Sequence, residues 1–241
     1  MNSGPTLDHV RIVLSRTSHP GNIGAAARAM KTMGLHRLVL VRPESFPDPI
    51  ADARASGAVD VLERARVVDS LEEALEGTVM VAAMTARRRE LATPARWARE
   101  AAVEAAAVAR AAEVALVFGN ETSGLSNEEL GLCHMPVMIP ANPDYSSLNL
   151  GAAVQLMCYE LRVAAADPGA APFMAGQAAS FEDVEGFYEH LQRLMVAREF
   201  LDPENPRKLM PRIRRLFGRI RLEREEVGIL RGLLSALEKK T

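Results

Sequence analysis

Cysteine is scarce in this sequence, which has only Cys133 and Cys158 among its 241 residues. The two do not form a C-x-x-C pair, and no histidines stand at spacings that would complete a tetrahedral zinc site. His134 follows Cys133, but adjacent residues of a strand point to opposite faces and cannot easily share one ion. We therefore expect two reduced cysteines that serve in packing, and no metal requirement.

Long apolar runs are missing too. None approaches the roughly 20 residues that a membrane-spanning helix needs, and the first residues lack the basic and apolar segments of a leader. With 48% hydrophobic and 25% charged residues, the composition is that of an ordinary folded protein. We expect a cytoplasmic protein without membrane association. The net charge of -2 argues against a surface that is basic throughout.

The common nucleotide-site motifs are absent. Neither GxGxxG nor GxxxxGK[ST] occurs, so a dehydrogenase or a kinase loses its main support. No GxSxG motif is present for a serine hydrolase of the α/β type.

What the sequence does contain is an alternation of short β-branched runs with helical segments. This pattern is typical of an α/β fold with a mostly parallel sheet. Strands are expected over residues 10–15, 37–41, 65–69, 78–84, 114–118 and 136–140. Helices are expected over residues 21–34, 70–77, 96–113 and 148–165, with another that opens at a capping box on Ser126.

The chain is long enough for one main domain of about 150 residues and an appendage. Residues 167–180 concentrate Pro, Gly and Ala without periodicity, which indicates a linker. We expect a main domain over 1–166, this linker, and an extension of three helices over 181–241. Residues 207–221 hold seven Arg or Lys and no acid, so they form either a solvated helix face or a surface for nucleic acid.

Three polar loops each follow an expected strand, and ligands collect at such carboxyl ends in open α/β sheets. The first loop brings Gly21, Asn22 and Gly24 to a helix start, with Arg28 further along. These residues can bind a phosphate. Alternatively, the glycines allow close helix packing and Arg28 is a surface charge.

The second loop places Glu121 between Gly119 and Gly124, directly after an apolar strand. A carboxylate there must find partners, so it either accepts backbone amides or positions a cationic group. The third loop has small polar groups over an apolar floor, which suits an adenosine ligand or simply caps the next helix. Its polar residues are Asn142, Tyr145, Ser146, Ser147 and Asn149, above Ile139 and Leu148.

In this order and spacing, the segments SHPGNIGAAARAMKTMG, VFGNETSGLSNEEL and IPANPDYSSLNLGAAVQLMCYE resemble the SPOUT superfamily of trefoil-knotted RNA methyltransferases. The similarity covers residues 9–165. The C-terminal helices resemble the extension of the TrmJ type, a bacterial family that methylates the ribose of tRNA nucleotide 32. The resemblance implies the SPOUT fold, α/β with a C-terminal knot, together with S-adenosyl-L-methionine as cofactor, tRNA as partner and a homodimer.

The resemblance also implies roles for particular residues. The cofactor would contact Met84, Thr85, Ala86, Gly119, Ile139, Ser146, Ser147 and Leu148. The catalytic residues would be Arg28, Glu121, Ser147 and Asn149, with Asn22 and Arg28 at the target nucleotide. If the basic segment binds the tRNA backbone, Arg214 and Arg215 contribute to it. Two positions depart from the pattern, because Asn120 stands where an arginine can occur and Met84 replaces a small hydroxyl residue.

The expected function is methylation of the ribose 2′-hydroxyl of cytidine or uridine at position 32 in the tRNA anticodon loop. A guanidinium is essentially always protonated, so Arg28 is expected to act as an electrostatic clamp and not as a base. One alternative is a SPOUT enzyme for rRNA or for the tRNA wobble nucleotide. Another is a non-catalytic RNA-binding protein. The accepted base, the substrate tRNAs and the proton acceptor stay open.

Overall fold

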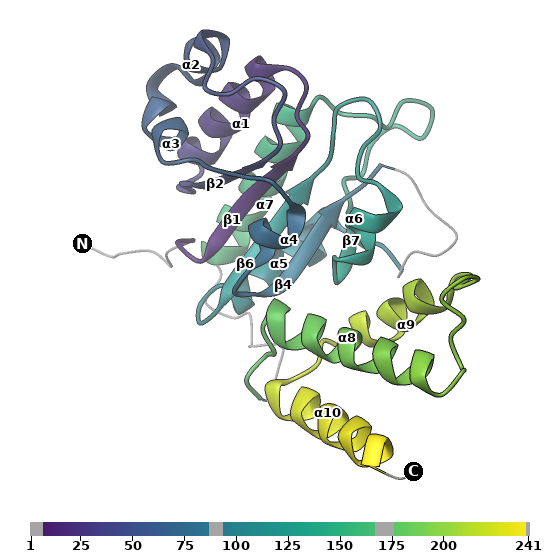
Figure 1. The fold of residues 1–241 in the computed structure, drawn as a ribbon. Helices are drawn as coiled ribbons and strands as arrows, with labels where there is room; N and C mark the ends of the chain where they lie inside the picture. The colour runs from purple at the N-terminus through teal and green to yellow at the C-terminus, as the bar shows by residue number, and fades with distance from the viewer. Residues whose placement is uncertain (1–6, 87–93, 167–175, 240–241) are drawn as a thin grey trace.

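A computed structural model describes residues 7–86, 94–166 and 176–239. It consists of an α/β part and a part of three helices that lies beside it (Figure 1). Residues 167–175 of the predicted linker lie outside the described residues.

The α/β part is built on one sheet of seven strands in the order β3-β2-β1-β6-β4-β7-β5. Every strand pair in it is parallel, which confirms the predicted parallel α/β architecture. The strands are β1 (Val10–Ser15), β2 (Arg37–Val41), β3 (Arg66–Val68), β4 (Thr78–Met84), β5 (Arg96–Trp97), β6 (Glu113–Phe118) and β7 (Met135–Met138).

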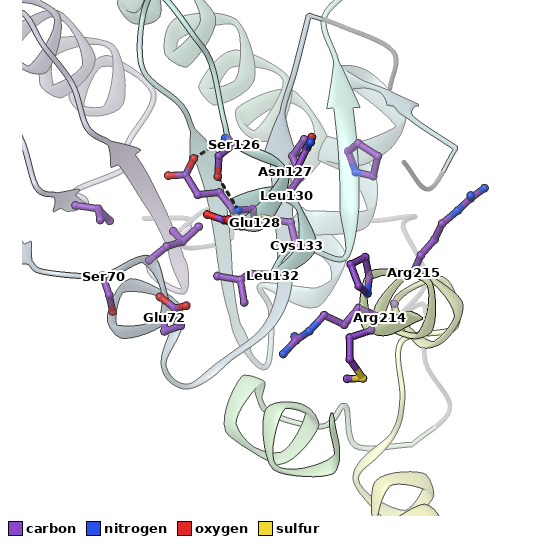
Figure 2. A pocket seen from close by; sticks show the side chains of 18 of the residues that line it. Ser70, Glu72, Ser126, Asn127, Glu128, Leu130, Leu132, Cys133, Arg214 and Arg215 are labelled. Carbon is purple, nitrogen blue, oxygen red and sulfur yellow. Dashed lines mark hydrogen bonds between the residues drawn. The ribbon is translucent and has the colours of Figure 1, made fainter. Parts of the chain in front are cut away.

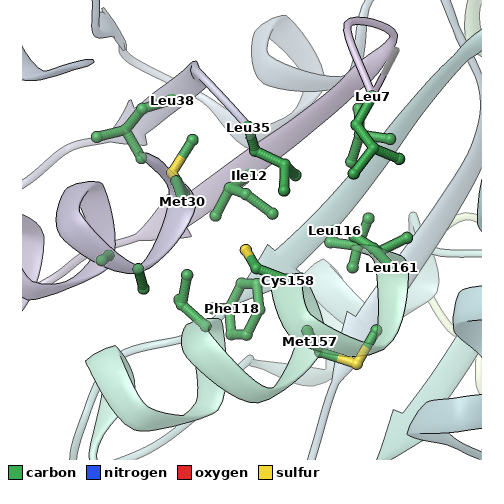
Figure 3. Packing of buried hydrophobic residues seen from close by; sticks show 14 of the residues in the cluster. Leu7, Ile12, Met30, Leu35, Leu38, Leu116, Phe118, Met157, Cys158 and Leu161 are labelled. Carbon is green, nitrogen blue, oxygen red and sulfur yellow. The ribbon is translucent and has the colours of Figure 1, made fainter. Parts of the chain in front are cut away.

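The helices cover both faces of the sheet. The larger apolar core lies under α1, α5 and α7, where Ile12 and Phe118 of the strands pack against Met157 and Cys158 of α7 (Figure 3). Both cysteines are free, and burial raises the pKa of Cys158 to about 12. The helices of the α/β part are α1 (Pro20–Thr32), α2 (Pro49–Ala55), the 3-10 turn η1 (Ser56–Ala58), α3 (Val59–Glu63), α4 (Leu71–Leu75), α5 (Ala98–Val108), α6 (Asn127–Gly131) and α7 (Leu150–Ala166).

The helical extension comprises α8 (Phe181–Ala197), α9 (Leu209–Gly218) and α10 (Arg224–Lys239). Its own core contains Phe187, Tyr188 and Phe217. The extension also contacts the α/β part directly. Phe181 belongs to a core cluster that also contains Leu71 and Leu75 of α4. The Glu182 carboxylate accepts a hydrogen bond from the Gly77 amide at 2.6 Å. The extension is therefore seated against the face of the sheet that carries α4.

The structure differs from the sequence expectations at the ends of several elements and in one unpredicted region. The last expected strand begins and ends earlier, at Met135–Met138. The helix expected over 96–113 begins at Ala98, because Arg96 and Trp97 pair with β7. The short helices between residues 49 and 63 were not predicted. Among the described residues, no helix combines the length and the apolar character that crossing a membrane requires.

Candidate active site

A cavity of about 380 Å³ opens at the carboxyl ends of β4, β6 and β7. Its volume lies in the range of small-molecule sites, about 300 to 1,000 Å³. All eight residues predicted to bind the cofactor line it: Met84, Thr85, Ala86, Gly119, Ile139, Ser146, Ser147 and Leu148. The structure thus brings the segment after β4 and the second and third loops, which are distant in sequence, to one cavity.

The wall formed by the second loop depends on close backbone approach. A Cβ at Gly119 would collide with the backbone of Gly124 and Leu125, so only glycine fits there. Gly124 has φ +69°, in the region that favours glycine, and its amide donates to the Asn120 carbonyl at 2.8 Å. The Asn120 side chain accepts from the Thr122 amide at 2.9 Å and donates to the Arg16 carbonyl at 2.7 Å. The departure at Asn120 therefore stabilises the turn and joins it to the first loop.

Glu121 is the residue that binds the first loop to the second. Its carboxylate accepts hydrogen bonds from the Ser18 amide at 3.0 Å, the Ser18 hydroxyl at 2.9 Å and the Asn22 side chain at 2.8 Å. Burial alone would raise the pKa of Glu121, but the hydrogen bonds from Ser18 and Asn22 outweigh it and hold the pKa below its usual range. Of the two interpretations of this carboxylate, acceptance of amides is the one that the contacts favour.

The third loop joins the same network through Asn149. Its side-chain amide donates to the side-chain oxygen of Asn22 at 3.0 Å, while its own side-chain oxygen accepts from the Gly151 amide at 2.9 Å. A chain of side-chain hydrogen bonds therefore runs from Glu121 through Asn22 to Asn149. One residue from each loop takes part, so the three loops are held in a fixed relation.

The glycines of the first loop serve helix packing. A Cβ at Gly24 would collide with the Ala51 carbonyl of α2. The start of α1 is capped by His19, whose Nδ1 accepts from the Gly21 amide at 3.0 Å. The glycines do allow close helix packing, although against α2 and not against the sheet.

Arg28 lies apart from this network. Its side chain is exposed on α1 and has no hydrogen bond or ion pair with any described residue. It does not line the cavity, nor do Asn22 and Asn149. Ser147 lines the cavity and is exposed.

The two arginines predicted in the basic segment differ in their surroundings. Arg214 forms two hydrogen bonds with the Glu185 carboxylate, at 2.5 and 2.7 Å, and its guanidinium lies 4.5 Å from the centre of the Tyr188 ring. Arg215 is half-buried, and its Nε has no hydrogen-bond partner among the described residues. Arg214 is thus part of the internal structure of the extension, whereas Arg215 keeps unused hydrogen-bonding capacity.

A second and larger cavity, of about 660 Å³, lies between α4 and α6 on one side and α9 on the other (Figure 2). We call it the α6–α9 groove. Sequence reasoning missed it, because its lining comes from separate segments spread along the chain from Arg16 to Gly218. It also missed Ser18, the main partner of Glu121, since a serine beside a helix start gives no signal beyond capping.

Comparisons with known proteins address the family. The model of the SpoU rRNA Methylase family matches residues 9–159. That of the tRNA methyltransferase TrmJ C-terminal domain matches residues 182–241. The chain is 49% identical over 244 residues to the tRNA (cytidine/uridine/adenosine-2'-O-)-methyltransferase TrmJ of Pseudomonas aeruginosa (strain UCBPP-PA14), covering 97% of this chain and 95% of the relative.

Solved structures give the same picture. TrmJ from Z. mobilis ZM4 aligns with a TM-score of 0.82 at 33% identity, over 95% of this chain and 99% of that one. A structure that concerns 2-OH methylation of C/U34 on tRNA aligns with a TM-score of 0.51 at 27% identity, over 63% of this chain and 93% of that one.

Proposed function

Because this chain belongs to the SpoU rRNA methylase family and ends in the C-terminal domain of TrmJ, we propose that it methylates the ribose 2′-hydroxyl of cytidine or uridine 32 in the tRNA anticodon loop. The methyl donor is S-adenosylmethionine. The chain has the α/β SPOUT fold that its motifs predict, with a helical C-terminal part. The observation that carries the proposal is the single cavity in which all eight predicted cofactor residues meet.

The cavity suits the cofactor chemically. Met84, Ile139 and Leu148 supply apolar surface for an adenosine, while Thr85 and Ser146 supply polar groups beside it. The close turn at Gly119 leaves backbone exposed to a ligand without a side chain between them. When bound, S-adenosylmethionine supplies an electrophilic methyl group on a sulfonium.

The protein's own contribution is positioning. A ribose hydroxyl is weakly acidic, so its oxygen must be held in line with the methyl group and relieved of its proton as the new bond forms. Glu121 is already occupied by Ser18 and Asn22, and its lowered pKa keeps it ionised and a weak base at neutral pH. We assign it as a positioning residue that holds Asn22, which in turn holds Asn149. The proton acceptor is left open.

Arg28 is proposed as the clamp for the target phosphate and the developing alkoxide. Its guanidinium is exposed and has no partner among the described residues, so it is free to bind an incoming phosphate. Ser147, on the cavity wall, is proposed to contact the cofactor and the ribose together.

We propose that residues 1–166 form the methyltransferase domain, 167–180 the linker and 181–241 the tRNA-binding extension. Within that extension, Arg215 is the better candidate for an RNA contact, since Glu185 and Tyr188 already engage Arg214. Arg214→Ala would remove an internal ion pair, so any loss of tRNA binding in that variant would be ambiguous.

We also propose a homodimer in the cytoplasm, paired through α7. That helix exposes Leu156, Tyr159 and Val163, with 40%, 47% and 47% of their surfaces accessible, along one face. A two-fold axis would bury this apolar face against its own copy. Tyr159→Glu should then halve the mass measured by light scattering and reduce turnover. A fully active monomer at assay concentration would contradict the dimer.

The helical extension helps to separate the proposed function from the alternative enzymes, which act on rRNA or on the tRNA wobble nucleotide. The structure that concerns C/U34 aligns with only 63% of this chain, whereas the TrmJ structure covers 95% of it, including helices of the extension. Labelled S-adenosylmethionine incubated with bulk tRNA and, separately, with rRNA, followed by nucleoside digestion and mapping, tests the proposal. Label at nucleotide 32 is expected. Label at the wobble nucleotide, or in rRNA alone, would favour the alternative enzymes, and failure to bind S-adenosylmethionine would favour a non-catalytic RNA-binding protein.

A further inference from the structure

Two arginines occupy an unusual backbone conformation at the edge of the sheet. Arg16 directly follows β1 with φ +52°, and Arg42 directly follows β2 with φ +44°. In this region a side chain is disfavoured and glycine is the usual residue, so each arginine costs stability where it stands. Their neighbours Ser15 and Val41 are register partners, so the two arginines leave adjacent strands side by side.

Both arginines line the α6–α9 groove, and neither side chain has a hydrogen bond or ion pair with a described residue. Strands are about 4.8 Å apart, which is close enough for two guanidinium groups to share one phosphodiester or hold two in succession. Strained, unpaired arginines that converge on one groove point to a ligand that neutralises them.

The opposite wall of the groove is basic as well. There Lys208, directly before α9, and Arg215 of α9 line the groove, and neither has an ion pair with a described residue. Arg214 points toward α4, whereas the Arg215 side chain points away from it (Figure 2). The floor is apolar and includes Leu132 and Met210.

Acidic residues limit where an anion can bind. Glu129 is occupied, because its carboxylate accepts hydrogen bonds from Ser15 and from the Ser126 amide. Asp69 follows β3 beside Arg42, and Glu72 and Glu128 also line the groove. Arg16 follows β1, one strand farther from Asp69, so the favourable position for a phosphate is on the Arg16 side of Arg42.

The Arg16 side of the groove adjoins the proposed active site. The Arg16 carbonyl accepts the hydrogen bond from Asn120, a residue of the cofactor cavity wall. The cavity wall continues through Leu125 into Ser126, where the groove begins. An RNA strand that enters the active site along this edge of the sheet would pass Arg16 and Arg42 and reach α9.

We infer that the α6–α9 groove is a second RNA site, in which Arg16 and Arg42 bind backbone phosphates of the strand next to the target nucleotide. This inference rests on the proposed function for its choice of RNA. The site would connect the active site to the basic helix of the extension, so that both parts hold one RNA.

The test compares two double variants. Arg16→Gly with Arg42→Gly removes both charges and also relieves the backbone, so the melting temperature should not fall. Arg64→Ala with Arg110→Ala removes two exposed arginines that lie outside the extension and line neither cavity, and serves as the matched control. Binding of bulk tRNA is measured by filter retention over a series of salt concentrations, with S-adenosylmethionine affinity measured by calorimetry.

Each phosphate contact contributes about 0.7 to 0.9 to the slope of log affinity against log salt concentration. The glycine pair should therefore lower the slope by about 1.5 and weaken binding roughly tenfold or more near physiological salt. Its affinity for S-adenosylmethionine should be unchanged. Arg16→Lys with Arg42→Lys should keep most of the slope, and the control pair should keep all of it.

An unchanged slope in the glycine pair, or an equal loss in the control pair, would overturn the inference. The outcome is separable from that of the proposed function. If the wild-type protein methylates tRNA and the glycine double variant keeps the wild-type salt slope, only the inference about the groove is refuted. If the wild-type protein transfers no methyl group but its tRNA binding depends on Arg16 and Arg42, only the proposed methylation is refuted.

Discussion

Removal of the Glu121 carboxylate is the perturbation whose consequences the structure defines best. Three hydrogen bonds of 2.8 to 3.0 Å from Ser18 and Asn22 end on it. A hydrogen bond to a charged group contributes about 1.5 to 3 kcal/mol. Glu121 is only partly buried, so water replaces much of that loss, and we expect Glu121→Ala to cost about 2 kcal/mol in total. For a chain of this size, that lowers the melting temperature by about 4 to 8 °C.

The effect on turnover should be larger than the effect on stability. Without Glu121, Asn22 loses one anchor and its bond to Asn149 no longer fixes the third loop. A displacement of about 1 Å at a reacting centre can cost about 100-fold in rate. Glu121→Gln keeps one acceptor oxygen without the charge and should fall between the wild type and Glu121→Ala. Glu63→Gln, at an exposed glutamate of α3 that lines neither cavity, is the matched control.

The pH dependence supplies an independent check. Because the pKa of Glu121 is held below its usual value, its contribution to stability is present above the unfolded pKa of about 4.3 and is lost as pH falls through the folded value. The difference in melting temperature between wild type and Glu121→Gln should therefore be full at pH 7 and shrink in acid. Scanning fluorimetry over that range, with turnover measured at pH 7, is the assay. Equal melting temperatures and equal turnover at pH 7 would refute the reasoning.

Three further predictions follow. Arg28→Ala should abolish methyl transfer, and so should Arg28→Lys, because a lysine cannot bind a phosphate bidentately. Calorimetry should show a nearly unchanged affinity for S-adenosylmethionine in both variants. Undiminished turnover would contradict the role of Arg28 as a clamp. Gly119→Ala places a Cβ against the backbone of Gly124 and should weaken S-adenosylmethionine binding about tenfold or more. Gly131→Ala, with open space around its Cβ, should leave that affinity unchanged. Equal affinities of the two variants would disprove the argument from the close turn. Burial lowers the pKa of His134 to about 4, so its neutral ring contributes stability above pH 6.5 that is lost as pH falls toward 4. His134→Gln should therefore lose less melting temperature over that window, and a parallel pH profile would contradict this.

The sheet was predictable from the sequence because its central strands are buried on both faces. The runs at 10–15, 37–41 and 78–84 are mostly apolar, with polar residues chiefly at their ends, and the strands have the same bounds. The short helices between residues 49 and 63 left no such signal, since each is too brief to show a period. Strand β5 consists of Arg96 and Trp97 alone and forms only because β7 lies beside it.

The sequence predicted which residues line the cofactor cavity, but it did not predict which side chains pair with one another. Loops that follow parallel strands meet at one edge, which is why residues as distant as Met84 and Ser147 line one cavity. The pairing of Arg214 with Glu185 joins two helices of the extension and leaves no mark in either segment alone. The α6–α9 groove likewise exists only once the extension is seated on the sheet.

The most direct test of the central claim, that this cavity delivers a methyl group to one ribose oxygen of tRNA, uses transcripts that lack a single acceptor oxygen. One transcript carries a 2′-deoxynucleotide at position 32, and its control carries one at position 34. With labelled S-adenosylmethionine, the account predicts no label in the first transcript and full label in the second. Label in the first, or its loss in the second alone, would contradict the account.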